Sequence, residues 1–383
     1  TYSPLLVSKS VARGWALQDS HRKTAIGHRV AGLSLNDPQT SFTMATTSTP
    51  ELEELTPNEA VQMYLADKQS DSAEATVRSH KSRLGHFLDW CEENGIENLN
   101  ELSGRDLHRY KLWRQEGINK VTLKTQLDTL RVFIRFCEGI DGVRQDLSQA
   151  VQSPKLEDGD NQREVIVEQD QAEQILGYLE KYEYCTLRHI YAILLWKTGM
   201  RVGATRAVDV DDVHLDEMAI EVNHRPDGET PIKNKDAGER YIAISEETTE
   251  VLRDWIQDRR PSVTDDHGRN PLLATKHGRV HIETLRKYSY QLTRPCEIGN
   301  GCPHNRDPED CEAIGFNDAS KCPESKSPHS WRRGHITHLL RQDTPKTVVS
   351  DRVNASPEVL EAHYNQMTEK EKMAQRRDYL GDI

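Results

Sequence analysis

Apolar residues recur at helical spacing through the first third of the chain. Between 121 and 137 they share one helix face, at Leu123, Leu127, Leu130, Ile134 and Cys137, which predicts an amphipathic helix. The same spacing predicts a helix over 77–91 that stops at Gly95, with shorter helices over 56–66 and 104–116. Together these segments predict an all-α domain at 50–152.

The pattern changes after residue 152. Residues 153–164 are polar and predict a linker. Helical periodicity returns near 170–180 and 185–197, and alternating apolar residues then predict strands at 218–222, 231–235 and 240–244, with a turn over 236–238. Helices are expected again over 246–258 and 281–294. The second domain, 165–383, is therefore expected to mix helices and strands, and the chain as a whole to be α+β and mostly helical.

Residues 1–49 have no clear periodicity, and Met44 has the look of a natural start. We expect this stretch to be a disordered or non-native extension. No apolar run along the chain approaches the ~20 residues that cross a bilayer. We therefore expect no membrane partner.

The formal net charge of −12 argues at first against a nucleic-acid partner, because phosphate contacts favour basic surfaces. Basic residues nevertheless outnumber acids eight to three between 105 and 135. They are Arg105, Arg109, Lys111, Arg114, Lys120, Lys124, Arg131 and Arg135. A basic stripe on an acidic body fits a DNA-binding face in a protein from a salt-loving organism, and a solvated helix face is the alternative.

Three short motifs suggest phosphodiester chemistry. Arg201 ends Thr198-Gly-Met-Arg, His329 and Arg332 stand three apart, and Tyr364 follows later in Glu361-Ala-His-Tyr. Guanidinium forks grip two phosphate oxygens and stay charged, and nearby cations favour the phenolate of a tyrosine. These residues would bind a phosphodiester and attack it without a metal; Tyr379 is the main competitor as nucleophile.

The order of these motifs resembles the tyrosine recombinases, the integrase family of DNA strand-exchange enzymes. The resemblance implies a helical, SAM-like core-binding domain and a mixed α/β catalytic domain that clamp double-stranded DNA at specific core sites. It also implies a homotetramer on DNA, a monomer or weak oligomer when free, and no cofactor for catalysis. In the family a hairpin lysine protonates the leaving 5′ oxygen. Lys233 and Lys235 are both candidates, and spacing from Arg240 favours Lys235.

Two positions depart from the family pattern. The family's second histidine or tryptophan falls at Ala355, with Asn354 the only nearby polar substitute, and the usual acid three residues after the first arginine is Ala204. The stretch around Asn354 resembles haloarchaeal integrases, which suggests a virus or mobile element. A type IB-like topoisomerase and a zinc-containing DNA-binding regulator that has lost catalysis are the alternatives.

Seven cysteines divide unevenly along the chain. Cys91 and Cys137 lie on apolar helix faces and are expected in the core. Four others and one histidine form an insertion at 295–323: Cys296, Cys302, His304, Cys311 and Cys322. In the reducing cytoplasm that we expect, this set predicts a closed structural zinc site, held by all four cysteines or by three of them with His304. Free thiols and disulfides are the alternatives.

Overall fold

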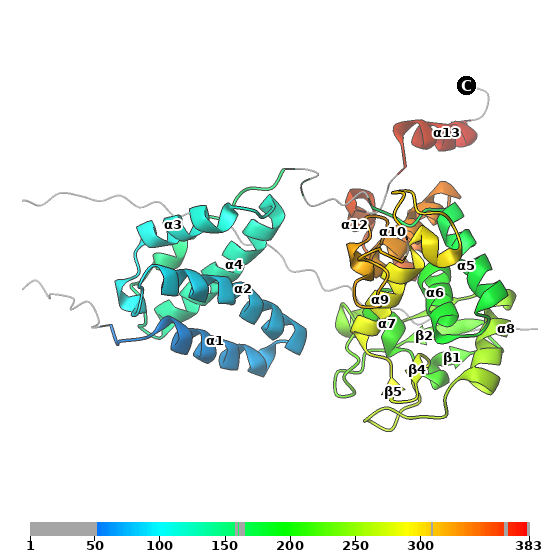
Figure 1. Ribbon diagram of the computed structural model, residues 1–383, viewed down its shortest axis with the longest axis horizontal. Helices are drawn as coiled ribbons and strands as arrows, with labels where there is room; N and C mark the ends of the chain where they lie inside the picture. The colour runs from blue at the N-terminus through cyan, green and yellow to red at the C-terminus, as the bar shows by residue number, and fades with distance from the viewer. Residues whose placement is uncertain (1–51, 158–159, 161–164, 308, 364–366, 381–383) are drawn as a thin grey trace, which may run out of the picture.

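The computed structural model describes residues 52–157, 160, 165–307, 309–363 and 367–380. The expected extension at 1–49 and most of 158–164 lie outside these ranges. Figure 1 shows a helical body in blue and cyan, and a larger body that contains all the labelled strands.

Four helices build the first body: α1 (Pro57–Asp71), α2 (Glu74–Glu93), α3 (Gly104–Gln115) and α4 (Lys120–Gly139). All five residues expected on the inner face of α4 are buried. Phe87 of α2 makes edge contacts with Tyr110 of α3 and Phe133 of α4, and each such pair adds about 0.5–1.5 kcal/mol beyond burial. The predicted all-α fold of this part is confirmed.

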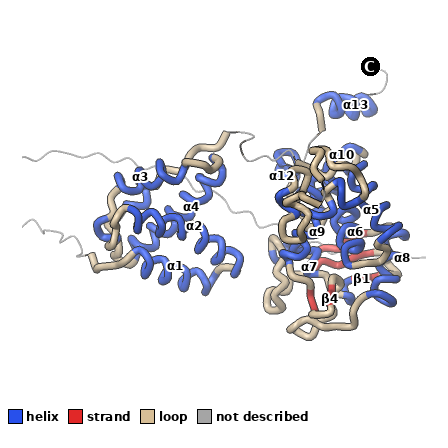
Figure 2. Tube along the Cα trace, in the orientation of Figure 1, coloured by secondary structure: helices blue, strands red, loops and turns tan. Residues whose placement is uncertain are grey.

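The second body is mixed. Its helices are α5 (Gln169–Tyr182), α6 (Leu187–Thr198), α7 (Val202–Ala207), α8 (Glu246–Asp254), α9 (Ile282–Leu292), α10 (Pro328–Arg341), α11 (Lys346–Val353), α12 (Pro357–His363) and α13 (Glu369–Leu380). Its strands are β1 (Val213–His214), β2 (Ala219–Val222), β3 (Arg240–Ala243), β4 (Ala274–Thr275) and β5 (Gly278–Arg279). Figure 2 shows the short strands gathered in one part of this body, with helices around them. The predicted α+β, mostly helical class is confirmed.

The strands form an antiparallel sheet in the order β1-β2-β3 and a separate β4-β5 hairpin. Glu221 of β2 stands opposite Tyr241 of β3. The expected strand at 231–235 is wrong, because β3 pairs with β2 instead. Pro231 has no N–H to offer a ladder, and Asn234 and Lys235 adopt left-handed backbone angles, with φ of 72° and 53°. Residues 223–239 therefore form a long loop between β2 and β3.

Helices α6 and α10 run through the middle of the second body. Nearly every residue of α6 is buried, and so are Trp331, Arg332 and Ile336 of α10. Gly334 lets α10 approach the chain before α5, since a Cβ there would lie 1.8 Å from the Val167 carbonyl oxygen. This packing holds α10, which carries the His-x-x-Arg motif, in a fixed place.

The last helix, α13, contacts α10. Gln375 donates a hydrogen bond of 2.5 Å to the Leu340 carbonyl, and Glu371 pairs with Arg341 at 3.1 Å. Among the described residues, each helix is too short or too polar to cross a membrane.

Candidate active site

Arg201 and Arg332 reach the same region from two elements. Arg201 is the N-cap of α7, and its Nη1 donates to the Asn354 carbonyl at 3.1 Å. Arg332 is fully buried in α10, and its Nη1 donates to the Gly199 carbonyl at 2.8 Å. Gly199 ends α6 with φ of 64°, a conformation that favours glycine. The turn at 198–201 thus positions both guanidinium groups.

Arg240 joins them from the first position of β3. Burial, together with the charges of Arg332, Arg201 and Arg352, lowers the pKa of Arg240 to about 10. Its Nε donates to the Arg352 carbonyl and its Nη1 to the Gly238 carbonyl, both at 2.8 Å. Guanidinium groups repel one another unless an anion lies among them, so this arginine cluster (Arg201, Arg240, Arg332 and Arg352) is suited to hold a phosphate.

In the sequence, Arg240 served only as a spacing marker for the lysines, and its place in the cluster was not predicted. The signal was available, because Arg240 shares a strand face with the buried Ile242. A charge at a half-buried strand position needs a partner or a function.

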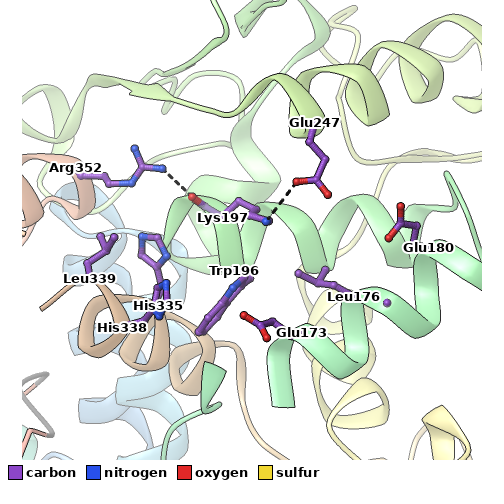
Figure 3. A pocket seen from close by; sticks show the side chains of 11 residues that line it. Glu173, Leu176, Glu180, Trp196, Lys197, Glu247, His335, His338, Leu339 and Arg352 are labelled. Atoms are coloured by element: carbon purple, nitrogen blue, oxygen red, sulfur yellow. Dashed lines mark hydrogen bonds and ion pairs between the residues drawn. The ribbon is translucent and has the colours of Figure 1, made fainter. Parts of the chain in front are cut away.

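Arg352 was also missed, and it has a supporting role. Its Nη2 donates to the Lys197 carbonyl at 2.7 Å and its Nη1 to the Ala243 carbonyl at 3.0 Å, which ties α11 to α6 and β3. It borders a cavity of 410 Å³ between α5, α6 and α10. In Figure 3, Lys197 lies between Arg352 and Glu247 and next to this cavity. The two hydrogen bonds of Arg352 fix the end of α11, where Asn354 begins the next turn.

His329 and Arg332 stand three residues apart on α10 and share a helix face. His329 is exposed in the first turn of the helix, whereas Arg332 is buried. The N-terminal end of a helix favours anions, because its N–H groups point outward. This placement allows the imidazole to reach an anion held over Arg332.

Both candidate lysines are exposed on the loop between β2 and β3. Lys235 begins a short 3₁₀ turn over Lys235–Gly238, directly after Asn234. The choice between Lys233 and Lys235 stays open.

Tyr364 directly follows α12 in sequence and lies outside the described residues, so its role stays a prediction. Ala355 is buried beside Val353 and Leu360 and contributes no polar group.

The basic stripe lies on α3 and α4, and several of its members are paired with acids. Lys124 and Arg131 both contact Asp128, at 2.5 and 2.9 Å, and Arg131 also donates to the Val151 carbonyl. Arg109 pairs with Asp106 and Lys120 with Asp160. Arg105, Lys111, Arg114 and Arg135 have no ion pair with an acid among the described residues. These four are the ones more available to an external anion.

The cysteine insertion folds into four similar turns. Each cysteine carbonyl accepts a hydrogen bond from the N–H three residues later: Gly299 to Cys296, Asn305 to Cys302, Ile314 to Cys311 and Ser325 to Cys322. All four side chains are partly buried. Among the described residues, no three His, Cys, Asp or Glu side chains are grouped so that they could hold a metal ion. The zinc site stays a prediction.

Burial and the neighbouring charge of Arg294 shift the pKa of Cys296 in opposite directions. Burial raises the pKa of Cys296, Arg294 opposes this shift, and Cys322 and Cys302 add to it. His304 pairs with Glu324 at 3.1 Å.

Comparison with known proteins identifies the class. Residues 166–371 match the phage integrase family, and residues 61–138 match the phage integrase N-terminal SAM-like domain. Because the first match covers more than half of the chain, the protein belongs to the phage integrase family. This confirms the resemblance to tyrosine recombinases seen in the motifs.

Individual relatives are distant. Tyrosine recombinase XerC of Lactobacillus delbrueckii subsp. bulgaricus is 26% identical over 201 residues, which is 52% of this chain and 64% of the relative. A probable integrase/recombinase protein of Methanocaldococcus jannaschii is 24% identical over 283 residues, 73% of this chain and 76% of that protein. The chain thus spans less than two thirds of the length of the first of these relatives.

Solved structures share the fold. The Tn1549 transposon integrase in complex with transposon right end DNA has a TM-score of 0.59 and 15% identity, covering 85% of this chain and all of the other. A lambda integrase dimer bound to a core site has a TM-score of 0.54 and 13% identity, covering 86% of this chain and 79% of the other.

Proposed function

We propose that this protein is a site-specific DNA recombinase that cuts and rejoins DNA through a 3′-phosphotyrosyl intermediate. The observation that supports this best is the convergence of Arg201, Arg240 and Arg332 from three separate elements. Structural relatives that are described as bound to transposon DNA or to a core site support DNA as the partner.

The chemistry is a transesterification. The Tyr364 phenol loses its proton to solvent and its oxygen bonds to phosphorus, while the bond from phosphorus to the 5′ oxygen breaks. Lys235 or Lys233 supplies the proton that this oxygen takes up. Arg201 and Arg332 hold the non-bridging oxygens, where charge accumulates, and His329 hydrogen-bonds to one of them. Attack by a 5′ hydroxyl of another strand reverses the step, so no nucleotide or metal is consumed.

The assembly follows from the same proposal. The helical body holds DNA through Arg105, Lys111, Arg114 and Arg135, opposite the catalytic body. Four subunits assemble on two core sites, where α13 leaves α10 of its own chain and docks on a neighbouring subunit. We place this reaction in the cytoplasm, with integration or excision of a viral or other mobile element of a halophilic archaeon as its purpose.

We also propose that the cysteine insertion binds one structural zinc ion. The proposal is supported by the residue types and by the local backbone. Each of the four cysteines begins a turn of the same kind, and the segment leads directly into α10. The pairing of His304 with Glu324 favours the four-cysteine set over the set with His304. Zn²⁺ prefers four thiolate ligands in a tetrahedron, and drawing the four side chains together around it would anchor the entry to α10.

Covalent capture tests the recombinase proposal. A core site is first selected from a random duplex library by binding, at both low and molar KCl because the chain is acidic. A second duplex carries a nick next to the cleavage point. On cleavage, the short fragment that bears the new 5′ hydroxyl dissociates, which traps the phosphotyrosyl adduct. We expect a protein–DNA band that survives denaturation with the wild-type chain and with Tyr379→Phe, and none with Tyr364→Phe.

The alternatives give different results. An adduct unchanged in Tyr364→Phe would show that the nucleophile is wrong. Adduct formation without strand exchange between two sites, together with relaxation of supercoils, would indicate a topoisomerase. Specific binding with no adduct in any variant would indicate a regulator.

A further inference from the structure

One polar side chain connects the lysine-bearing loop to the arginine cluster. The Asn354 Oδ1 accepts a hydrogen bond from Asn234 Nδ2 at 2.9 Å, and the Asn354 Nδ2 donates to the Lys233 carbonyl at 3.4 Å. Asn234 lies between the two candidate lysines. A single amide therefore holds the loop segment 233–235 by two points.

The backbone of the same residue contacts the first arginine, because Arg201 Nη1 donates to the Asn354 carbonyl. Asn354 has φ of 52° and ends α11. Asparagine is one of the few side chains that tolerate this left-handed conformation. The turn after α11 thus points its carbonyl at Arg201 and its side chain at the loop.

The loop backbone packs closely around this amide. A Cβ on Gly238 would lie 2.8 Å from Asn354 Nδ2 and 2.4 Å from the Lys233 carbonyl oxygen. Gly238 also accepts the hydrogen bond from Arg240. The loop from 233 to 238 is therefore fixed on one side by Asn354 and on the other by the arginine cluster.

We propose that Asn354 is a positioning residue for catalysis: it holds the lysine loop at a set distance from the phosphate bound by Arg201. This inference rests on the proposed recombinase function. An exposed lysine on a long loop would otherwise sample many positions, and restricting it to the right one is how orientation accelerates a reaction. The neighbouring Ala355 is buried and cannot perform this task.

The test compares two leaving groups. In Asn354→Gly the left-handed backbone is retained and the amide is lost. We expect DNA cleavage to slow by about 10- to 100-fold, the range for two ordinary hydrogen bonds that act in the transition state.

The second substrate has sulfur in place of the bridging 5′ oxygen. Its leaving group departs as a thiolate, whose conjugate acid has a pKa near 8.5. It needs no proton from lysine, and we expect Asn354→Gly to cleave it within about threefold of wild type.

Controls separate positioning from folding. Lys235→Ala, or Lys233→Ala if that lysine is the acid, should show the same rescue by sulfur, and Arg201→Lys should show none. Asp141→Gly, a change to glycine at another left-handed position, with φ of 53°, should leave both rates unchanged. Asn234→Gly loses one of the two hydrogen bonds and should show a smaller defect that sulfur also rescues, and the double variant should be no slower than Asn354→Gly.

Two outcomes would overturn the inference. One is a full cleavage rate in Asn354→Gly on the oxygen substrate. The other is an equal loss on both substrates, which would show general disruption of the site. If the wild-type chain cleaves neither substrate, the recombinase proposal itself fails.

Discussion

Replacing Gly199 with alanine is expected to damage both stability and cleavage. Gly199 has φ of +64°, and an added Cβ would lie 2.3 Å from His335 Cδ2. The left-handed conformation costs an alanine about 1–2 kcal/mol, and forcing apart a packed contact costs about 1–3 kcal/mol more. We therefore expect a loss of about 2–5 kcal/mol in the free energy of unfolding. The Gly199 carbonyl also accepts from Arg332, so cleavage should slow too.

Gly268→Ala is the matched control. Gly268 has φ of +73° in the same body, and no heavy atom of the described residues lies within 4 Å of its added Cβ. It should lose only the backbone cost of about 1–2 kcal/mol and retain cleavage. The assay is urea unfolding of the full chain followed by tryptophan fluorescence, with adduct formation measured in parallel. Equal losses in the two variants would refute the role given to the contact with His335.

Three further predictions concern charge and metal. Burial holds the pKa of His335 at about 3, below the ordinary value near 6.5, so the unfolded chain takes up the proton first. Stability should fall by up to about 1.4 kcal/mol per pH unit as pH drops from 6.5 toward 3, and His335→Gln should flatten that slope in denaturant titrations. Arg135→Ala should weaken DNA binding and reduce the slope of log affinity against log salt by about 1. Arg131→Ala loses a structural contact, so it should lower the melting temperature and leave that slope nearly unchanged. Metal analysis should find one zinc per chain, lost in Cys322→Ser and retained in Cys91→Ser; zinc-free wild-type protein would refute the site.

The helical half of the fold was predictable because its signal is local. The spacing of Leu123 and Leu127 on α4 reports directly which face is buried. The strand expected at 231–235 failed for a local reason too: alternation suggested pairing, but Pro231 and the left-handed Asn234 prevent it. The partner of β3 comes from 18 or more residues earlier in the chain, and a single-sequence pattern does not show such pairing.

The candidate site was predictable in its parts but not in its connections. The order of Arg201, His329 and Arg332 indicated the family, since each motif is short and local. The roles of Arg240 and Arg352 depend on contacts between β3, α6 and α11, which no spacing rule reveals. The same is true of Asn354, whose importance comes from where its amide and carbonyl point.

Because the arginine cluster gathers like charges, the protein should be less stable without a bound anion than with one. Burial lowers the pKa of Arg240, and the neighbouring arginine charges lower it too, so the fold carries this cost until an anion binds. Phosphate, and DNA above all, should then stabilise the tertiary structure and raise the unfolding temperature, by an amount that grows with the logarithm of the ligand concentration above its dissociation constant. Substrate binding should therefore stabilise the part of the fold that carries the catalytic residues.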